Sequence, residues 1–215
     1  MKLRFIVNSS LFCLLLLGGC ATSRSIIDIK TPTENQPAQT NGRDVYISST
    51  TDRRIFEVNP SSPNTPSLNP SEDQSDKVKL RSIARKRNTF GKALGDILLQ
   101  EGQSVESLTT ASIRQAFAQK GYRIIDNKDK ITDSTYIVDT DITKFWSWMN
   151  PGFLAITLST EISTDIRIKS HQGTDRQTVN VKSTDNFQTG VDGNWEKVVN
   201  MALKSYVSDL ETKIK

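Results

Sequence analysis

The sequence predicts an α+β fold, in which an antiparallel sheet of about 4–6 strands carries two main helices on one face. Segment 153–169 alternates apolar and polar residues, as does a strand with one buried and one solvated face. Segments 104–121 and 192–210 repeat apolar residues at the spacing of an amphipathic helix. The two apolar stripes would cover the apolar face of the sheet.

The strands are expected in segments that alternate or that are rich in β-branched and aromatic residues between turn signals. They cover residues 45–47, 54–58, 77–82, 122–125, 135–149, 153–169 and 177–183. Within 153–169 the apolar residues on one face are Leu154, Ile156, Leu158, Ile162, Ile166 and Ile168. Segment 88–103 contains three glycines and has weak periodicity, so it is expected to be mostly irregular.

Each helix has its own start and stop signals. Ser104 is a good N-cap for the first helix, and Gly121 is a good stop. Asp192 or Asn194 opens the second helix. The apolar stripe of the second helix comprises Trp195, Val198, Val199, Ala202, Leu203, Tyr206, Val207 and Leu210.

The N-terminus has the pattern of a secretory signal. Lys2 and Arg4 precede a short apolar run, which ends in Leu17-Gly18-Gly19-Cys20. This ending resembles the lipobox of bacterial lipoproteins. The resemblance implies that residues 1–19 are removed and that Cys20 carries acyl chains, palmitate among them. An ordinary signal with a chance cysteine and an uncleaved anchor are the alternatives.

Two polar segments interrupt the expected domain. Residues 20–41 are predicted to be the lipidated cysteine and a disordered tether, because the segment is polar and contains Pro32 and Pro37. Residues 42–215 are predicted to form a single periplasmic domain. Within it, the proline-rich segment 59–76 is expected to be a long exposed loop.

The composition excludes several kinds of site. One His and two Cys exclude two-histidine metal sites and four-thiolate clusters, so no metal or cofactor is expected. A net charge of +4 is too small and too dispersed to predict nucleic-acid binding. The glycines near Lys92 lack the spacing of a phosphate-binding loop, so no nucleotide is expected either.

The aromatic cluster before and after the expected turn 150–152 is the first candidate contact surface. Exposed aromatic side chains at a strand end would bind a partner, a glycan or a membrane interface. The alternative is packing in the core or at its rim. The candidate partner-contact residues are Phe145, Trp146, Trp148 and Phe153.

Two charged groups are further candidates. The dense basic run is a candidate patch for an anionic lipid head group or an acidic partner, with a solvated strand face as the alternative. It comprises Lys77, Lys79, Arg81, Arg85, Lys86 and Arg87. Asp139 and Asp141 are expected on one strand face together with Phe145. Paired carboxylates can act as acid and base, although on a solvated strand they are more often only polar.

The chain as a whole resembles YajG-type bacterial envelope lipoproteins. The likeness rests on the lipobox, on Arg87-Asn88-Thr89-Phe90-Gly91 and on the capped helix ending in Gln119-Lys120-Gly121-Tyr122. It implies a Gram-negative envelope lipoprotein with one α/β domain and no established catalytic residues. Ala21 after Cys20, in place of Asp, implies release to the periplasmic face of the outer membrane.

These patterns favour a non-enzymatic lipoprotein, anchored in the membrane through Cys20. It would serve as a binding or accessory subunit of an envelope transport or assembly system and would contact another envelope protein. The alternative is a cell-wall glycan-binding or hydrolytic protein that uses Asp139 and Asp141 beside Trp146 and Trp148.

Overall fold

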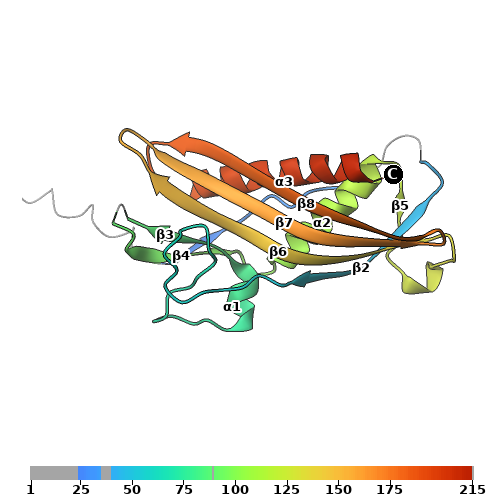
Figure 1. Cartoon of the computed structure of the whole chain (residues 1–215), viewed down its shortest axis with the longest axis horizontal. Coiled ribbons are helices and arrows are strands. Elements are labelled where there is room, and N and C mark those ends of the chain that lie inside the picture. The colour runs from blue at the N-terminus through green and yellow to red at the C-terminus, as the bar shows by residue number, and fades with distance from the viewer. Residues whose placement is uncertain (1–23, 35–39, 89, 215) are drawn as a thin grey trace, which may run out of the picture.

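The computed structural model of the chain describes residues 24–34, 40–88 and 90–214 (Figure 1). The predicted signal peptide and the predicted lipidation site Cys20 lie outside these residues. The described residues form an eight-stranded mixed sheet, and the long helices α2 and α3 cover one of its faces (Figure 1). The mixed helix and sheet composition and the two main helices agree with the prediction.

The sheet order is β1-β4-β3-β6-β2-β5, with β7 paired to β6 and β8 paired to β7. The strands are β1 Ser25–Ile27, β2 Asp44–Asp52, β3 Ser82–Arg87, β4 Ala93–Leu99, β5 Arg123–Ile124, β6 Tyr136–Pro151, β7 Ile156–Ser170 and β8 Gly173–Phe187. The helices are α1 Asp76–Arg81, α2 Val105–Gln119, the 3-10 turn η1 Lys128–Lys130 and α3 Asp192–Lys213. The sheet therefore has more strands than expected, and its β1–β4, β2–β5, β2–β6 and β3–β6 pairs are parallel.

Helix α2 forms for the reasons the sequence indicates, whereas α3 begins at Asp192 after Val191 and has no side-chain N-cap. At the start of α2, the Ser104 hydroxyl accepts from the backbone N–H of Ser107, and the Ser107 hydroxyl accepts from the N–H of Ser104. Gly121 follows the helix at a φ of +84°, the left-handed conformation that glycine adopts without strain. The predicted apolar stripe of α3 is buried along its whole length.

Strands β6, β7 and β8 form the antiparallel meander that the alternation predicts. Leu158, Ile162 and Ile166 are buried beneath the helices. Leu154 belongs to the same predicted face but lies in the turn before β7, where it is 78% exposed.

A β-bulge between Ile142 and Lys144 changes which side chains of β6 share a face. Before the bulge, Asp139 and Asp141 lie on the face opposite the helices. After it, Phe145 lies in the core with the helices, whereas Trp146 does not belong to that cluster. The expectation that Phe145 shares a face with the two carboxylates was therefore wrong, because the alternation continues unbroken only in the absence of a bulge.

Three segments have a different secondary structure from the expected one. Residues 54–58 do not form a strand, because β2 ends at Asp52 and the next regular element is α1. Residues 77–82 do not form a strand, because they belong to helix α1 and to the first residue of β3. A segment with only Val78 and Leu80 as apolar residues is too short to distinguish a helix from a strand by periodicity. Segment 88–103 is also not mainly irregular, because it contains β4, which is almost wholly buried.

Part of the predicted tether forms a strand of the sheet. Strand β1 pairs with β4, and Ile27 and Ile29 are buried. The side chain of Gln103 accepts from the Ile29 N–H at 3.1 Å and donates to its carbonyl at 2.7 Å. Burial of the isoleucines outweighs the polar composition of the segment, so residues 24–34 are part of the domain.

The proline-rich loop is also more ordered than its sequence suggests. Pro66 and Leu68 are buried, and Leu68 packs with Val78 and Leu98 in a small second core. Phe56, just before the loop, contacts the ring of Trp146 edge-on at 5.9 Å. The loop therefore covers the face of the sheet that the helices leave open, at the β3 side.

The buried guanidinium of Arg54 joins helix α1, which follows this loop, to the sheet. It binds the Asp52 carboxylate at 2.9 and 2.8 Å. It also donates to the carbonyls of Ser82 and Phe145 at 2.7 and 2.8 Å, and to that of Lys79 at 2.7 Å. These contacts join β2, α1, β3 and β6 at the point where β6 changes its partner from β2 to β3.

We predict that Arg54→Ala lowers the free energy of unfolding by about 3–5 kcal/mol, because it leaves the carboxylate of Asp52 buried without its partner. Urea denaturation followed by circular dichroism measures the loss. Arg53→Ala is the matched control, because Arg53 is 67% exposed and its contact with Asp141 is 3.4 Å long. This control is expected to cost less than about 1 kcal/mol. Equal losses in the two variants would contradict the central role of Arg54.

Candidate functional site

The carboxylates proposed for acid–base chemistry are engaged in ion pairs on the open face of the sheet. Asp139 accepts from Lys169 at 2.9 Å, and Asp141 accepts from Arg167 at 2.8 Å. The hydrogen bond from Arg167 lowers the pKa of Asp141. Partial burial raises the pKa of Asp139, but the hydrogen bonds from Lys169 and Ser49 outweigh it and the net pKa is lowered. Both carboxyls are therefore ionised at neutral pH, which does not suit a general acid.

The aromatic cluster follows the alternative of packing in the core or at its rim, except for Phe153. Phe145 and Trp146 are 0% exposed and Trp148 is 5% exposed, whereas Phe153 is fully exposed. The indole N–H of Trp146 donates to the carbonyl of Pro63 in the covering loop. The ammonium groups of Lys144 and Lys182 lie 5.7 and 5.0 Å from the ring of Trp148. The glycan-hydrolase alternative required exposed Trp side chains beside the carboxylates, and the structure does not provide them.

The basic run does not form a single exposed patch either. The Arg85 side chain is 6% exposed and donates to the carbonyl of Leu68 at 2.8 Å. Four other cations of the run also contact nearby groups. Lys79 pairs with Asp76, and Arg81 donates to the carbonyl of Leu99. Lys86 donates to the hydroxyl of Ser25, and Arg87 donates to the carbonyl of Gly91. Lys77 is exposed. The run changes from helix to strand at Ser82, and its alternation therefore does not persist as one face.

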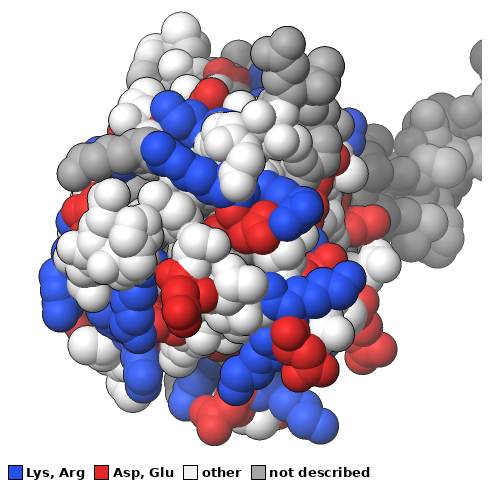
Figure 2. All heavy atoms as spheres, turned by 90° about the vertical axis from the view of Figure 1, so that its right-hand side faces the viewer, with Lys and Arg blue, Asp and Glu red and all other residues white. Residues whose placement is uncertain are grey.

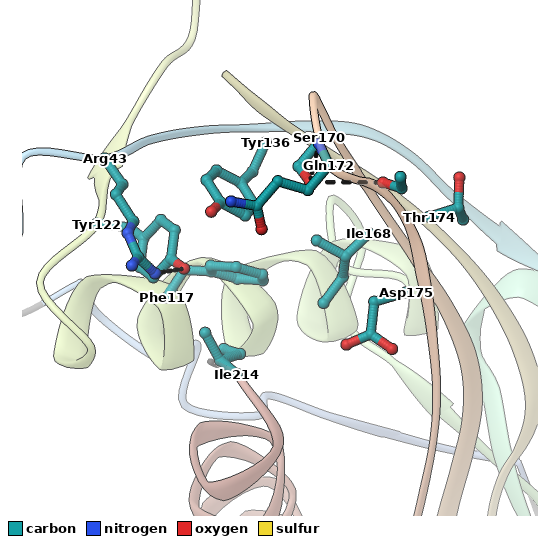
Figure 3. A pocket seen from close by; sticks show the side chains of 11 residues that line it. Arg43, Phe117, Tyr122, Tyr136, Ile168, Ser170, Gln172, Thr174, Asp175 and Ile214 are labelled. Atoms are coloured by element: carbon teal, nitrogen blue, oxygen red, sulfur yellow. Dashed lines mark hydrogen bonds between the residues drawn. The ribbon is translucent and has the colours of Figure 1, made fainter. Parts of the chain in front are cut away.

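A pocket lies at the end of the sheet where β6 begins (Figure 3). Its volume is about 420 Å³. Phe117 of α2, Tyr122, Tyr136 of β6, Ile168 of β7 and Ile214 after α3 provide its aromatic and aliphatic walls. Its polar lining comes from Arg43 and from the turn and strand residues Ser170, Gln172, Gly173, Thr174 and Asp175.

A set of aromatic rings in edge-on contact positions the guanidinium in this pocket. Tyr122 meets Phe117 at 5.1 Å and Tyr136 at 5.3 Å, both edge-on. Arg43 donates to the Tyr122 hydroxyl at 3.2 Å and lies 5.9 Å from the centroids of both tyrosine rings. The hydrogen bond to Tyr122, together with the charge interactions with both phenols, raises the pKa of Arg43. The guanidinium therefore remains positively charged.

The pocket combines apolar and polar side chains. Aromatic and aliphatic side chains line its interior, and the guanidinium of Arg43 and the carboxylate of Asp175 supply polar groups. Positive and negative side chains are interspersed over this end of the molecule, with uncharged surface between them (Figure 2). The arrangement suits binding of a ligand that carries both apolar and polar groups.

Sequence reasoning missed every polar residue of this pocket. Arg43, Tyr122 and Asp175 come from three distant segments, and no motif links them. Strands were expected at 153–169 and 177–183, and the residues between them were given no role. The available signal was Gly121, which ends α2 and places Tyr122 directly after the helix.

The described residues contain no group of three or more His, Cys, Asp or Glu side chains placed to hold a metal ion. Within the same part of the chain, no helix is long and apolar enough to cross a membrane.

Comparison with known proteins gives likenesses to solved structures only. No known protein family and no curated protein sequence matches the chain. A Xanthomonas campestris protein of family DUF330 has a TM-score of 0.44 at 12% identity, over 87% of this chain and 91% of its own. An uncharacterized protein has a TM-score of 0.49 at 8% identity, over 86% of this chain and 100% of its own. A minor lipoprotein from Acinetobacter baumannii has a TM-score of 0.32 at 10% identity, over 48% of this chain and 83% of its own. The resemblance to YajG-type lipoproteins therefore stays a prediction from the sequence.

We predict that Arg167→Gln raises the pKa of Asp141 toward its ordinary value, because the charged hydrogen bond from the Arg167 guanidinium to the carboxylate is lost. In the native protein this pairing stabilises the fold above the unfolded pKa, about 3.9, and the stabilisation is lost as pH falls through the lower folded value. Carbon-13 NMR titration of the carboxyl measures the shift. The carboxyl of Asp185, whose pKa is lowered by Lys197, is an internal control and should not move. An Asp141 pKa near neutrality would contradict the assignment and revive an acid–base role.

Proposed function

We propose that this chain is a lipid-anchored lipoprotein of a bacterial envelope, whose domain binds another envelope component and catalyses no reaction. The lipobox ending in Cys20 supports the anchor, and Ala21 supports the periplasmic face of the outer membrane. The ion-paired carboxylates and buried indoles described above favour binding over hydrolysis. Such a domain would act as an accessory subunit of a transport or assembly system.

The observation that carries the binding role is the position of the pocket. The chain joins the sheet at β1, and through β4 and β3 this region lies beside Ser147 of β6. The pocket contains Tyr136, eleven residues earlier on the same strand. At about 3.3 Å per residue, these two regions are about 36 Å apart along the strand. A domain tethered at the first region would hold its pocket away from the membrane, where a periplasmic partner can reach it.

The anchor is tested by metabolic labelling with radioactive palmitate in a Gram-negative host. The native chain is expected to incorporate label and to fractionate with the outer membrane. Cys20→Ser is expected to incorporate none, because the acceptor thiol is gone. Cys13→Ser is the matched control and should be labelled like the native chain, since Cys13 lies in the predicted signal. Equal labelling of Cys20→Ser would show that the anchor is assigned to the wrong residue.

The pocket is tested by photocrosslinking in intact envelopes. A benzoylphenylalanine in place of Gln172, an exposed pocket residue, is expected to give one adduct of defined mass. Thr174→Trp, which places a ring at the pocket, should reduce the adduct at least fivefold. Asn180→Trp is the matched control on the same strand outside the pocket, and it should leave the adduct unchanged. No adduct from a folded, membrane-bound protein, or an equal effect of both variants, would contradict binding at this pocket.

A further inference from the structure

The end of the domain opposite the pocket exposes large apolar side chains on two hairpins. Phe153 is 100% exposed and Leu154 is 78% exposed, between β6 and β7. Phe90 is 92% exposed, between β3 and β4. Val191, which precedes α3, is 58% exposed. We call these four side chains the apolar end.

The sheet register brings the two hairpins to the same end of the molecule. Strands β3 and β6 run parallel, and Ala84 lies opposite Ser147. The same offset continued beyond the strands brings Phe90 to the level of Phe153, and Figure 1 shows both hairpins at its left-hand end. Val191 belongs with them, because its neighbour Gly190 lies beside Met149 and Ile156 at the base of the β6–β7 hairpin.

The chain joins the domain from the same direction. Strand β1 is parallel to β4, which runs away from the hairpin that carries Phe90. Arg24, the first described residue, is fixed to the sheet by ion pairs with Asp96 at 3.2 Å and Glu72 at 2.9 Å. Asp96 is four residues from Lys92 at the hairpin turn, about 13 Å along the strand.

The maximum span of the chain from Cys20 to Arg24 is similar to the distance from Asp96 to the hairpin turn. Cys20 precedes Arg24 by four residues, which can span at most about 14 Å. An acylated Cys20 can therefore lie no more than about 14 Å from Arg24. The apolar end would then lie close to the bilayer that holds the acyl chains. Lys92, beside Phe90, is exposed and suits the anionic head groups of such a surface.

We propose that the apolar end docks on the phospholipid bilayer, with Phe90, Phe153 and Leu154 inserted in the interfacial region. The inference rests on the proposed lipidation of Cys20 for its geometry. The free energy falls when exposed aromatic and aliphatic side chains leave water for the boundary between head groups and acyl chains. Docking fixes the long axis of the sheet across the periplasm and points the pocket away from the membrane.

The experiment measures the depth of a fluorophore in vesicles of phosphatidylethanolamine and phosphatidylglycerol. The mature lipidated protein carries a nitrobenzoxadiazole label on Ala155→Cys, beside Leu154, or on Gln172→Cys at the pocket. Lipids with a nitroxide on the acyl chain are expected to quench the label at position 155 at least threefold more than the label at position 172. In the protein labelled at position 155, the double substitution Phe153→Ser and Leu154→Ser should at least halve the quenching. Ile55→Ser is the matched control, because Ile55 is also exposed but adjoins Arg54 in the middle of the sheet.

Each outcome distinguishes docking from the anchor itself. Equal quenching at positions 155 and 172, or none at position 155 while the protein floats with the vesicles, overturns the docking and leaves the anchor intact. Insensitivity of the label at position 155 to Phe153→Ser with Leu154→Ser also overturns it. The same absence of quenching is expected if a protein partner or a second copy of the chain covers the apolar end. If palmitate labelling fails, the anchor is wrong, yet selective quenching at position 155 still supports docking because the label reports depth.

Discussion

The hydrogen bonds of the Arg54 guanidinium are the interactions on which the arrangement of the sheet depends. Strand β6 pairs with β2 along its first half and with β3 at Ser147, so the partner edge of β6 has a break. Backbone carbonyls at such a break need donors, since a buried acceptor without a partner is costly. Arg54 supplies donors to Ser82 and Phe145, and Asp52 balances its charge. Because the same guanidinium reaches the carbonyl of Lys79, it also fixes α1 to the sheet.

The proline-rich loop before α1 explains why both faces of β6 are buried in its second half. The helices cover Phe145 on one face, and the loop covers Trp146 on the other. The bulge after Ile142 divides β6 into a half with a charged open face and a half with an aromatic covered face. Ion pairs therefore stabilise the first half, where Asp139 and Asp141 are solvated on one side, and packing stabilises the second.

Local patterns predicted those parts of the fold that depend on local rules. Ser104 and Gly121 bound α2, and the alternation in 153–169 specifies β7, because capping and periodicity act within a few residues. The parallel strands, the bulge and the docking of Ile27 on β4 depend on partners distant in sequence, which a single sequence does not reveal. The pocket was missed for the same reason, because Arg43 and Tyr122 meet only through the fold. For Trp146 the sequence left core packing and a contact surface both open, because composition alone does not show the loop that covers it.

The two ends of the sheet have opposite chemistry, and β6 connects them. Its first residue, Tyr136, helps to line a pocket with a fixed guanidinium, and the turn after its last residue carries exposed Phe153 and Leu154. Charged groups stay hydrated or paired, whereas exposed apolar groups favour a nonpolar environment. A domain that must both rest on a lipid surface and meet a partner in water would have this polarity along its long axis. The rigid meander of β6, β7 and β8 keeps the two ends at a fixed separation, so contact at one end determines where the other can bind.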